Sequence, residues 1–289
     1  MNQGSMIRVQ DLRFSYPGSP EQTLKGLDFE VVDGEIFGFL GPSGAGKSTT
    51  QNVLVGLLGG YAGAVELMGR SPAAWGSDLF EDVGVAFEAP SHFERLTATE
   101  NLRYFGGLYQ GQVESPERLL ELVNLESAAD QLVSHFSKGM KRRLTFVRSL
   151  MHHPRLLFLD EPTSGLDPAN ARRIKDLILE RREAGTTIFL TTHDMAAAEE
   201  LCDWVAFLVD GELRALDAPE RLKDQYGERK VVVELDLATG VEEKEYELDD
   251  LGQNETFLND IRTHRVRRIH SQESTLEDVF LKVTGRSLG

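Results

Sequence analysis

The feature of this chain that most limits its possible folds is a regular alternation of short apolar runs with longer amphipathic stretches. Apolar runs flanked by turn-forming residues are typical of strands buried on both faces. Five such runs occur: Ile36 to Leu40, Val83 to Phe87, Leu156 to Leu159, Thr187 to Leu190 and Val205 to Val209. Helical patterns, such as 169–183 and 195–201, lie between several of them. The alternation predicts an α/β fold with a mostly parallel sheet.

A helical region interrupts this alternation. From Thr97 to Met151 the pattern is almost wholly helical, most clearly over 117–123 and 140–151. Because strand patterns lie on both sides of it, we interpret the region of about 97–151 as a helical subdomain inserted between strands of the sheet.

The composition changes again after Gly227. Two segments predict half-exposed strands and two later ones have helical patterns, namely 231–237, 243–248, 257–262 and 274–283. We therefore expect a main domain at 6–227 and a small α/β accessory or regulatory domain at 228–289. Residues 1–5 are interpreted as a tag remnant that precedes a natural start at Met6. Most charges of the C-terminal part are expected to be solvated, and a regulatory or dimer-stabilising role is a hypothesis.

Charge and cysteine content exclude some classes of protein. The 31 basic and 47 acidic residues give a formal net charge of -16, which argues against sequence-independent binding of nucleic acid. No apolar run approaches the roughly 18 residues that a membrane-spanning helix needs. Cys202 is the only cysteine, so no intramolecular disulfide can form and the chain is expected to be intracellular.

The strongest chemical signal is the octapeptide GPSGAGKS from Gly41 to Ser48. It follows a predicted strand and precedes a helical run, which is the setting of a phosphate-binding loop. Small residues allow backbone N–H groups and the positive end of the helix to approach an anion closely. Lys47 is expected to reach the β- and γ-phosphates, and Ser48 to bind magnesium. An ordinary glycine-rich turn would not require both flanking elements, so the loop predicts binding of a nucleoside triphosphate.

A pair of carboxylates ends another predicted strand. Asp160 and Glu161 follow the apolar run Leu156 to Leu159. Asp160 is expected to hold magnesium through water, and Glu161 to orient or deprotonate the attacking water. A surface acidic pair is the alternative, but carboxylates after a buried strand are costly unless cations are near.

Further motifs make the chain resemble the nucleotide-binding subunits of ABC transporters. Beyond the phosphate loop and the acidic strand end, the motifs that carry the resemblance are Ser137-Lys138-Gly139-Met140-Lys141, Ser164-Gly165-Leu166-Asp167 and Thr192-His193-Asp194. The Ser-Lys-Gly-Met form of the signature and the ending Leu276-Glu277-Asp278-Val279-Phe280 look like exporters of the antibiotic-efflux type. The resemblance covers residues 6–225 closely and the tail loosely. It implies a P-loop NTPase fold of ABC type with an antiparallel N-terminal β-subdomain.

The resemblance also implies roles for individual residues. Tyr16 would stack on adenine, His193 would contact the γ-phosphate as part of the catalytic site with Glu161, and Asp167 would communicate between subunits. ATP and Mg²⁺ are the implied cofactors. The ATP-binding set is Tyr16, Gly41, Pro42, Ser43, Gly44, Ala45, Gly46, Lys47, Ser48 and Thr49, and the set facing ATP on the opposite subunit is Ser137, Lys138, Gly139 and Met140.

Each of these assignments has a structural alternative. Tyr16 could pack on a strand, His193 could be an ordinary loop histidine, and Ser137 could cap a helix. Lys138 departs from the commoner signature and is interpreted as an added phosphate-facing charge, with a solvated lysine as the alternative. The order of the motifs, rather than any one residue, favours the functional interpretation.

Glu88 occupies a position where the family usually has glutamine. The family residue touches magnesium and helps to form the groove for a membrane-domain helix. A carboxylate is also a hard oxygen donor, so Glu88 is expected to keep the metal-ligand role, together with Ser48 and Asp160. The alternative is that Glu88 points into the groove and pairs with a basic residue there.

These patterns predict an ATP-hydrolysing subunit of an ABC transporter, in particular an exporter. Two copies, or this chain and a homologous ATPase, would sandwich ATP and drive transmembrane permease subunits, with no nucleic-acid partner. The chain would be cytoplasmic and peripheral on the cytoplasmic face of the membrane. A soluble mechanical ABC ATPase is the rival class, but its long coiled-coil insertion or second cassette is missing here. An ATP-binding module without turnover is opposed by Glu161 and His193.

Overall fold

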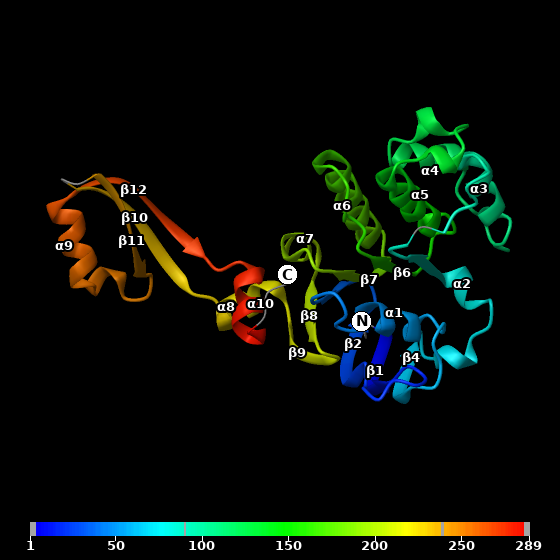
Figure 1. Cartoon of the computed structure of the whole chain (residues 1–289), viewed down its shortest axis with the longest axis horizontal. Coiled ribbons are helices and arrows are strands. Elements are labelled where there is room, and N and C mark those ends of the chain that lie inside the picture. The colour runs from blue at the N-terminus through cyan, green and yellow to red at the C-terminus, as the bar shows by residue number, and fades with distance from the viewer. Residues whose placement is uncertain (1–3, 90, 238–239, 286–289) are drawn as a thin grey trace. The chain divides into compact units, whose positions relative to one another are not determined.

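The computed structural model describes residues 4–89, 91–237 and 240–285, which form two compact units (Figure 1). The first unit extends to Leu216 and the second begins at Asp217. The second unit therefore starts before residue 228, where the sequence placed the boundary. The reason is that helix α8 (Pro219–Tyr226) packs against α10 (Leu276–Thr284).

A six-stranded sheet with the order β5-β6-β7-β3-β8-β9 forms the centre of the first unit. All five strands predicted from the apolar runs are present, as β3 (Ile36–Leu40), β5 (Val83–Ala86), β6 (Leu156–Asp160), β7 (Thr187–Thr192) and β8 (Trp204–Val209). These five strands pair with one another in parallel, which confirms the predicted α/β class. Strand β9 (Glu212–Asp217) lies at the edge.

A smaller antiparallel sheet accompanies the main one, as the resemblance implied. It has the order β2-β1-β4 and consists of β1 (Ser5–Phe14), β2 (Leu24–Val32) and β4 (Ala62–Leu67). Phe29 of β2 lies with its ring centroid 5.6 Å from that of Phe37 and 5.3 Å from that of Phe39, both on β3. The two sheets therefore share one aromatic core, which holds the strand that leads into the phosphate loop.

Helices follow the strands of the main sheet and also form a separate group. The first set is α1 (Lys47–Leu54), α6 (Pro168–Glu183) and α7 (Met195–Leu201), with the short α2 (Leu79–Asp82) before β5. The second set is α3 (Ala98–Gly106), α4 (Pro116–Leu122) and α5 (Lys138–Leu150), gathered at one side of the unit (Figure 1). On α5, Leu144 and Val147 are fully buried, and Met151 is buried just after it.

The second unit is a three-stranded antiparallel sheet with one helix on it and a pair of helices beside it. The sheet has the order β11-β10-β12, with β10 (Arg229–Leu237), β11 (Gly240–Glu247) and β12 (Arg265–Glu273), and α9 (Glu255–Thr263) contributes Phe257 to its core. Strand β12 was not predicted. All its residues but Val266 are exposed, so it has no alternation of buried and exposed positions.

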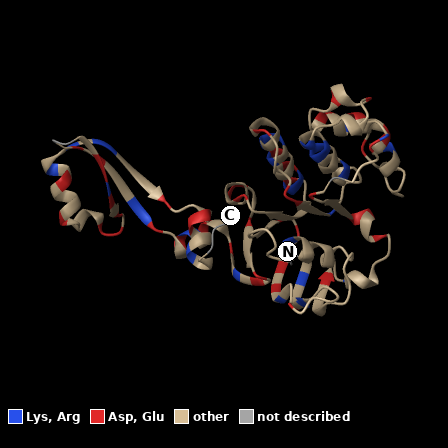
Figure 2. Ribbon diagram, viewed as in Figure 1, with Lys and Arg blue, Asp and Glu red and all other residues tan. Residues whose placement is uncertain are grey.

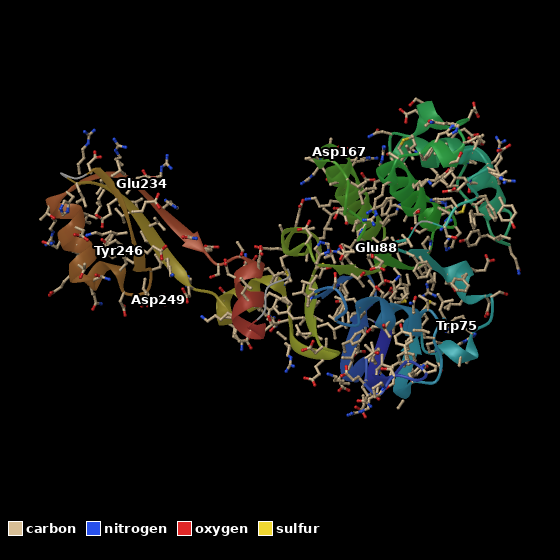
Figure 3. All side chains as sticks on the ribbon, viewed as in Figure 1. Trp75, Glu88, Asp167, Glu234, Tyr246 and Asp249 are labelled. Atoms are coloured by element: carbon tan, nitrogen blue, oxygen red, sulfur yellow. The ribbon has the colours of Figure 1, made fainter. Side chains whose placement is uncertain are left out.

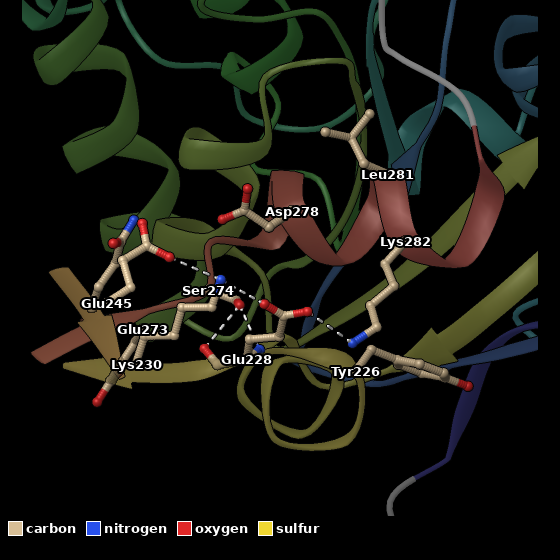
Figure 4. A pocket seen from close by; sticks show the side chains of 10 residues that line it. Tyr226, Glu228, Lys230, Glu245, Glu273, Ser274, Asp278, Leu281 and Lys282 are labelled. Atoms are coloured by element: carbon tan, nitrogen blue, oxygen red, sulfur yellow. Dashed lines mark hydrogen bonds and ion pairs between the residues drawn. The ribbon is translucent and has the colours of Figure 1, made fainter. Parts of the chain in front are cut away.

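Charges in this second unit are segregated and largely paired. Glutamates lie along β11 and arginines along β12 (Figure 2). An open cavity of about 480 Å³ lies between the sheet and α10 (Figure 4). On the cavity wall, the Glu228 carboxylate forms ion pairs with Lys230 at 3.0 Å and with Lys282 at 3.7 Å. The backbone of Glu228 exchanges two hydrogen bonds with the Ser274 hydroxyl. These contacts tie the start of β10 to the end of β12.

Two histidines, His92 and the buried His152, should make the stability of the first unit depend on pH. Burial lowers the pKa of His92 to about 4 and that of His152 to about 4, and the His152 ring stacks on Tyr109 with centroids 4.2 Å apart. Between pH 4 and 6.5 the unfolded chain binds more protons than the folded chain, so stability should fall as pH falls through this range. Allowing for partial solvent screening, we expect a loss of about 1 to 2 kcal/mol per histidine between pH 7.5 and 5.

Thermal unfolding at both pH values checks this expectation. His152→Phe keeps an aromatic ring against Tyr109 but removes the titration, so its Tm should depend less on pH than that of the parent. His135 is exposed, and His135→Gln is therefore the matched control, which should keep the parent's pH dependence. Equal slopes for the parent and His152→Phe would contradict the assignment.

Candidate functional site

The loop between β3 and α1 has a backbone that only glycine accommodates at two of its positions. Gly46 has φ 110°, and a Cβ there would lie 2.8 Å from Leu24 Cδ2. A Cβ on Gly41 would lie 2.1 Å from the Leu208 carbonyl oxygen of the neighbouring strand β8. The loop is thus held closely against the sheet, with the N-terminus of α1 directly after it.

Lys47 folds back over this loop. Its Nζ donates to the carbonyl oxygens of Gly41 at 2.6 Å and Pro42 at 3.1 Å. Burial lowers the pKa of Lys47, and the nearby carboxylates of Glu161, Asp160 and Glu88 partly oppose that shift. An ammonium group in this position can exchange a carbonyl partner for an anionic oxygen, because both accept hydrogen bonds and the anion gives the stronger one.

The carboxylate that ends β6 is held by two hydroxyl groups. Ser48 Oγ donates to Asp160 Oδ2 at 3.3 Å, and Thr191 Oγ1 on the adjacent strand β7 donates to Asp160 Oδ1. Asp160 is itself buried. A hydroxyl and a carboxylate placed this close are the hard oxygen donors that Mg²⁺ prefers, and the small number of protein ligands leaves room for phosphate oxygens and water.

Glu161 follows directly, but its carboxylate has a different set of partners. Thr192 Oγ1 donates to Oε2 at 3.0 Å, and the His193 backbone N–H donates to Oε1 at 3.0 Å. His193 Nδ1 lies 2.6 Å from the same Oε1. The backbone of Glu161 is left-handed, with φ 51°, and its carboxylate has none of the hydroxyl partners of Asp160. The two adjacent acidic residues therefore have separate hydrogen-bond partners.

These groups line one cavity of about 270 Å³. The structure brings together most of the residues that sequence reasoning proposed for phosphate, metal and hydrolysis: Ser43, Gly44, Gly46, Lys47, Ser48, Thr49, Glu88, Asp160, Glu161 and His193. No cluster of three or more His, Cys, Asp or Glu side chains suited to a metal ion occurs among the residues described. The donor set fits a metal held jointly with a phosphate chain.

Other predicted residues lie outside this cavity. The hydroxyl of Tyr16 lies 3.1 Å from Thr49 Oγ1, and the residue is 42% exposed beside the loop. Ser137 caps α5 by accepting from the Met140 N–H at 3.2 Å, which is the structural alternative considered above. Lys138 lines a separate cavity of about 330 Å³ with Phe136 and Lys141, among others.

Asp167, proposed for communication between subunits, caps α6 and is exposed (Figure 3). Its carboxylate accepts from the backbone N–H of Asn170 at 3.0 Å and from the Asn170 amide at 2.6 Å. Gly139, in the first turn of α5, has space around its Cα, since a Cβ would come only as close as 3.4 Å to Leu166. Neither residue contacts the phosphate-loop cavity of its own chain.

Sequence reasoning assigned no role to three side chains that hold the site, although Thr192 lies in one of the motifs that carry the resemblance. Thr191 and Thr192 fix the two carboxylates from β7, and Arg142 of α5 reaches the carbonyl oxygen of Glu161 at 2.8 Å. The two threonines directly follow the predicted strand Thr187 to Leu190, and Arg142 lies among other basic residues on a helix. The available signal was weak, because only the fold brings β7 and α5 next to the end of β6.

The glycine-restricted loop, the buried lysine and the two differently held carboxylates define a nucleoside-triphosphate-binding protein of the P-loop class. Comparison with known families narrows this class. A family model described as ABC transporter matches residues 24–164, and one described as fluoroquinolone efflux ABC transporter C-terminal domain matches residues 229–273.

Similar proteins and structures agree with the family models. A fluoroquinolones export ATP-binding protein of Mycobacterium tuberculosis (strain ATCC 25618 / H37Rv) is 52% identical over 98% of this chain and 94% of its own length. Nod factor export ATP-binding protein I of Rhizobium sp. (strain N33) is 36% identical over 92% and 93%. A solved ATP-binding subunit of an ABC transporter has a TM-score of 0.69 and 30% identity, covering 76% of this chain and 93% of that structure.

A second solved structure is a dimeric ATP-binding cassette in a post-hydrolysis state with ADP and Pi. It has a TM-score of 0.67 and 25% identity over 74% of this chain and 98% of that one. The chain therefore belongs to the ATP-binding proteins of ABC transporters, and it is an ATP-hydrolysing subunit of that family. No described helix is both long enough and apolar enough to cross a membrane.

Proposed function

We propose that this chain is the ATPase subunit of an exporter that removes fluoroquinolone-type antibiotics. The observation that carries the proposal is the 52% identity to a fluoroquinolones export ATP-binding protein along 98% of the chain. The match of residues 229–273 to the C-terminal domain of such proteins supports it, because that region lies outside the ATPase motifs. Permease subunits in the membrane would bind the drug and hold this chain on the cytoplasmic face.

Within this proposal the site residues divide the work of hydrolysis. The phosphate loop and Lys47 bind the triphosphate, and Tyr16 offers a ring face to adenine. Ser48 and Asp160 would hold Mg²⁺, which neutralises phosphate charge when bound. Glu161 acts as the general base toward water, since Thr192 and His193 hold its carboxylate at the cavity wall.

The position of the protons on the His193 ring limits which hydrogen bonds the ring can donate. If Nδ1–H donates to Glu161 over 2.6 Å, the neutral ring offers only an acceptor at Nε2. Donation from Nε2 to a phosphate oxygen at the same time therefore requires the imidazolium form. The proposed contact of His193 with the γ-phosphate is accordingly a contact of the protonated ring or of a ring that has released Glu161.

The second half of each ATP site would come from another copy. Ser137 and Gly139 are at the start of α5 and do not line the phosphate-loop cavity of their own chain. We propose that they contact the nucleotide bound by the partner copy, with Lys138 adding charge and Asp167 lying at the junction. ATP-driven closure of this head-to-tail dimer, and opening after hydrolysis, would move the permease subunits.

Drug-stimulated ATPase activity tests the proposed function. The chain is purified with the membrane protein that co-purifies with it and is reconstituted into liposomes. We expect a fluoroquinolone to raise the ATPase rate a few-fold and to be transported in an ATP-dependent manner, with Glu161→Gln as the inactive control. ATP hydrolysis that ignores fluoroquinolones but responds to another substrate class would overturn the drug assignment and leave the ATPase assignment intact.

A further inference from the structure

The guanidinium group of Arg142 lies at the meeting point of three segments that carry the site. Arg142 is on α5, and its side chain is only 7% exposed. Its Nη1 donates to the carbonyl oxygens of Glu161 at 2.8 Å and Ser164 at 2.5 Å. Its Nη2 donates to the carbonyl oxygen of Glu88 at 3.4 Å. One side chain of α5 thus joins the loop after β5 to the turn after β6.

These contacts bear on the backbone that presents Glu161. A non-glycine residue in the left-handed region costs roughly 1 to 2 kcal/mol, so the φ of 51° at Glu161 must be held by its surroundings. Two of the Arg142 hydrogen bonds end on the turn from Glu161 to Ser164. A guanidinium is suited to this task, because its planar donors bind several oxygens at once and its charge strengthens each bond.

Glu88 makes the remaining contact of Arg142. Glu88 Oε1 lies 4.0 Å from Nη2, at the outer limit of an ion pair, and its side chain is 59% exposed. Glu88 also lines the cavity that contains Lys47 and Asp160. A carboxylate held this loosely can turn toward the cavity or toward Arg142 at little cost. The buried Arg142 charge favours the second position, since a buried charge is costly without a partner.

We propose that Arg142 is a positioning residue for hydrolysis, which holds the turn that carries Glu161 and links that turn to Glu88. Movement of the Glu88 carboxylate toward or away from Arg142 then changes the geometry of Glu161. Helix α5 and the loop after β5 thereby act on the hydrolytic carboxylate through one side chain. The inference deepens the proposed function and rests on its assignment of Glu161 as general base.

Substitutions on α5 test the positioning role in the full chain, together with its co-purifying membrane protein. Arg142→Gln removes the charge and most of the donors, whereas Arg142→Lys keeps the charge but cannot reach all three carbonyls. Arg143→Gln is the matched control, because Arg143 donates to the carbonyls of Val123 at 2.5 Å and Asn124 at 3.2 Å, away from the site.

We expect Arg142→Gln to lower kcat by about 10- to 100-fold while the Kd for ATP changes by less than about threefold, as misplacement of a general base should do. Arg142→Lys should fall between this variant and the parent, and Arg143→Gln should keep the parental kcat. Thermal unfolding with and without ATP shows whether each protein is folded and binds nucleotide. If Arg142→Gln does not fold, Arg142→Lys decides by the same comparison. Parental kcat in the folded variant would overturn the proposal.

A double-mutant cycle tests the link to Glu88. Glu88→Gln should change kcat in the parent and have no further effect in Arg142→Gln, because the link through which it acts is then absent. Independent, multiplicative effects would overturn the link. Glu161→Gln in the same assay separates the two levels of inference. Full activity of Glu161→Gln would overturn the base assignment, whereas an inactive Glu161→Gln beside a fully active Arg142→Gln would overturn the positioning role alone.

Discussion

The Glu161→Gln protein should bind ATP with close to parental affinity and hydrolyse it about 10²- to 10⁴-fold more slowly, which is the usual contribution of a general base. The amide oxygen can accept from the His193 backbone in place of Oε1, and the amide nitrogen can donate to the Thr192 hydroxyl in place of Oε2, so the local geometry should survive. Only the ability to take a proton is lost. Phosphate release measures the rate, and equilibrium binding of ATP measures the affinity.

The same variant should also dimerise when ATP is added, because it closes around nucleotide without turning it over. Light scattering should show a monomer without nucleotide and a dimer with ATP. The control is Glu161→Gln combined with Lys47→Ala, which should remain monomeric. Undiminished hydrolysis by Glu161→Gln would remove Glu161 as the base, and a monomer at saturating ATP would count against the proposed sandwich.

Lys47→Ala should weaken ATP binding by about 10- to 100-fold, since charge-assisted hydrogen bonds contribute about 1.5 to 3 kcal/mol. The ammonium group now bonds to the carbonyls of Gly41 and Pro42 and is buried at the cavity wall. A phosphate chain would take it over from those carbonyls. Titration with ATP at fixed magnesium concentration measures the change in Kd.

Lys25→Ala is the matched control for Lys47→Ala, because Lys25 is exposed on β2 and does not line the cavity. It should bind ATP as the parent does. The Tm of each protein without nucleotide shows whether lost affinity reflects lost structure. Equal affinities of the parent and folded Lys47→Ala would show that the loop does not bind phosphate through this lysine.

The parts of the fold that followed from sequence are those in which local pattern and burial agree. The runs that became β3, β6 and β8 are apolar throughout, and the structure buries every residue of β3 and β6. Both faces of such strands are covered by other parts of the fold, so no polar position interrupts the apolar run. The phosphate loop was equally easy to predict from sequence. The backbone at Gly44 and Gly46 is left-handed, a conformation that favours glycine, so the requirement is visible in the local sequence.

Strand β12 and the boundary of the second unit were harder to predict, because no local pattern in the sequence marks them. The exposed residues of β12 pair with β10 through their backbone, and backbone pairing leaves no mark on side-chain composition. Helix α8 looked continuous with the first unit in sequence, yet its contacts are with α10. Both outcomes depend on contacts between residues that are distant along the chain.

The sequence by itself determined the α/β class, the phosphate loop and the acidic pair at the end of β6, because each is written in consecutive residues. Only the tertiary structure decided which side chains hold each of the two carboxylates. Thr191 binds Asp160, while Thr192 binds Glu161, because adjacent residues of β7 meet adjacent residues at the end of β6. It also decided that Arg142 lies against Glu161 and Glu88, since packing of α5 beside β5 and β6 brings together three segments that are separate in sequence.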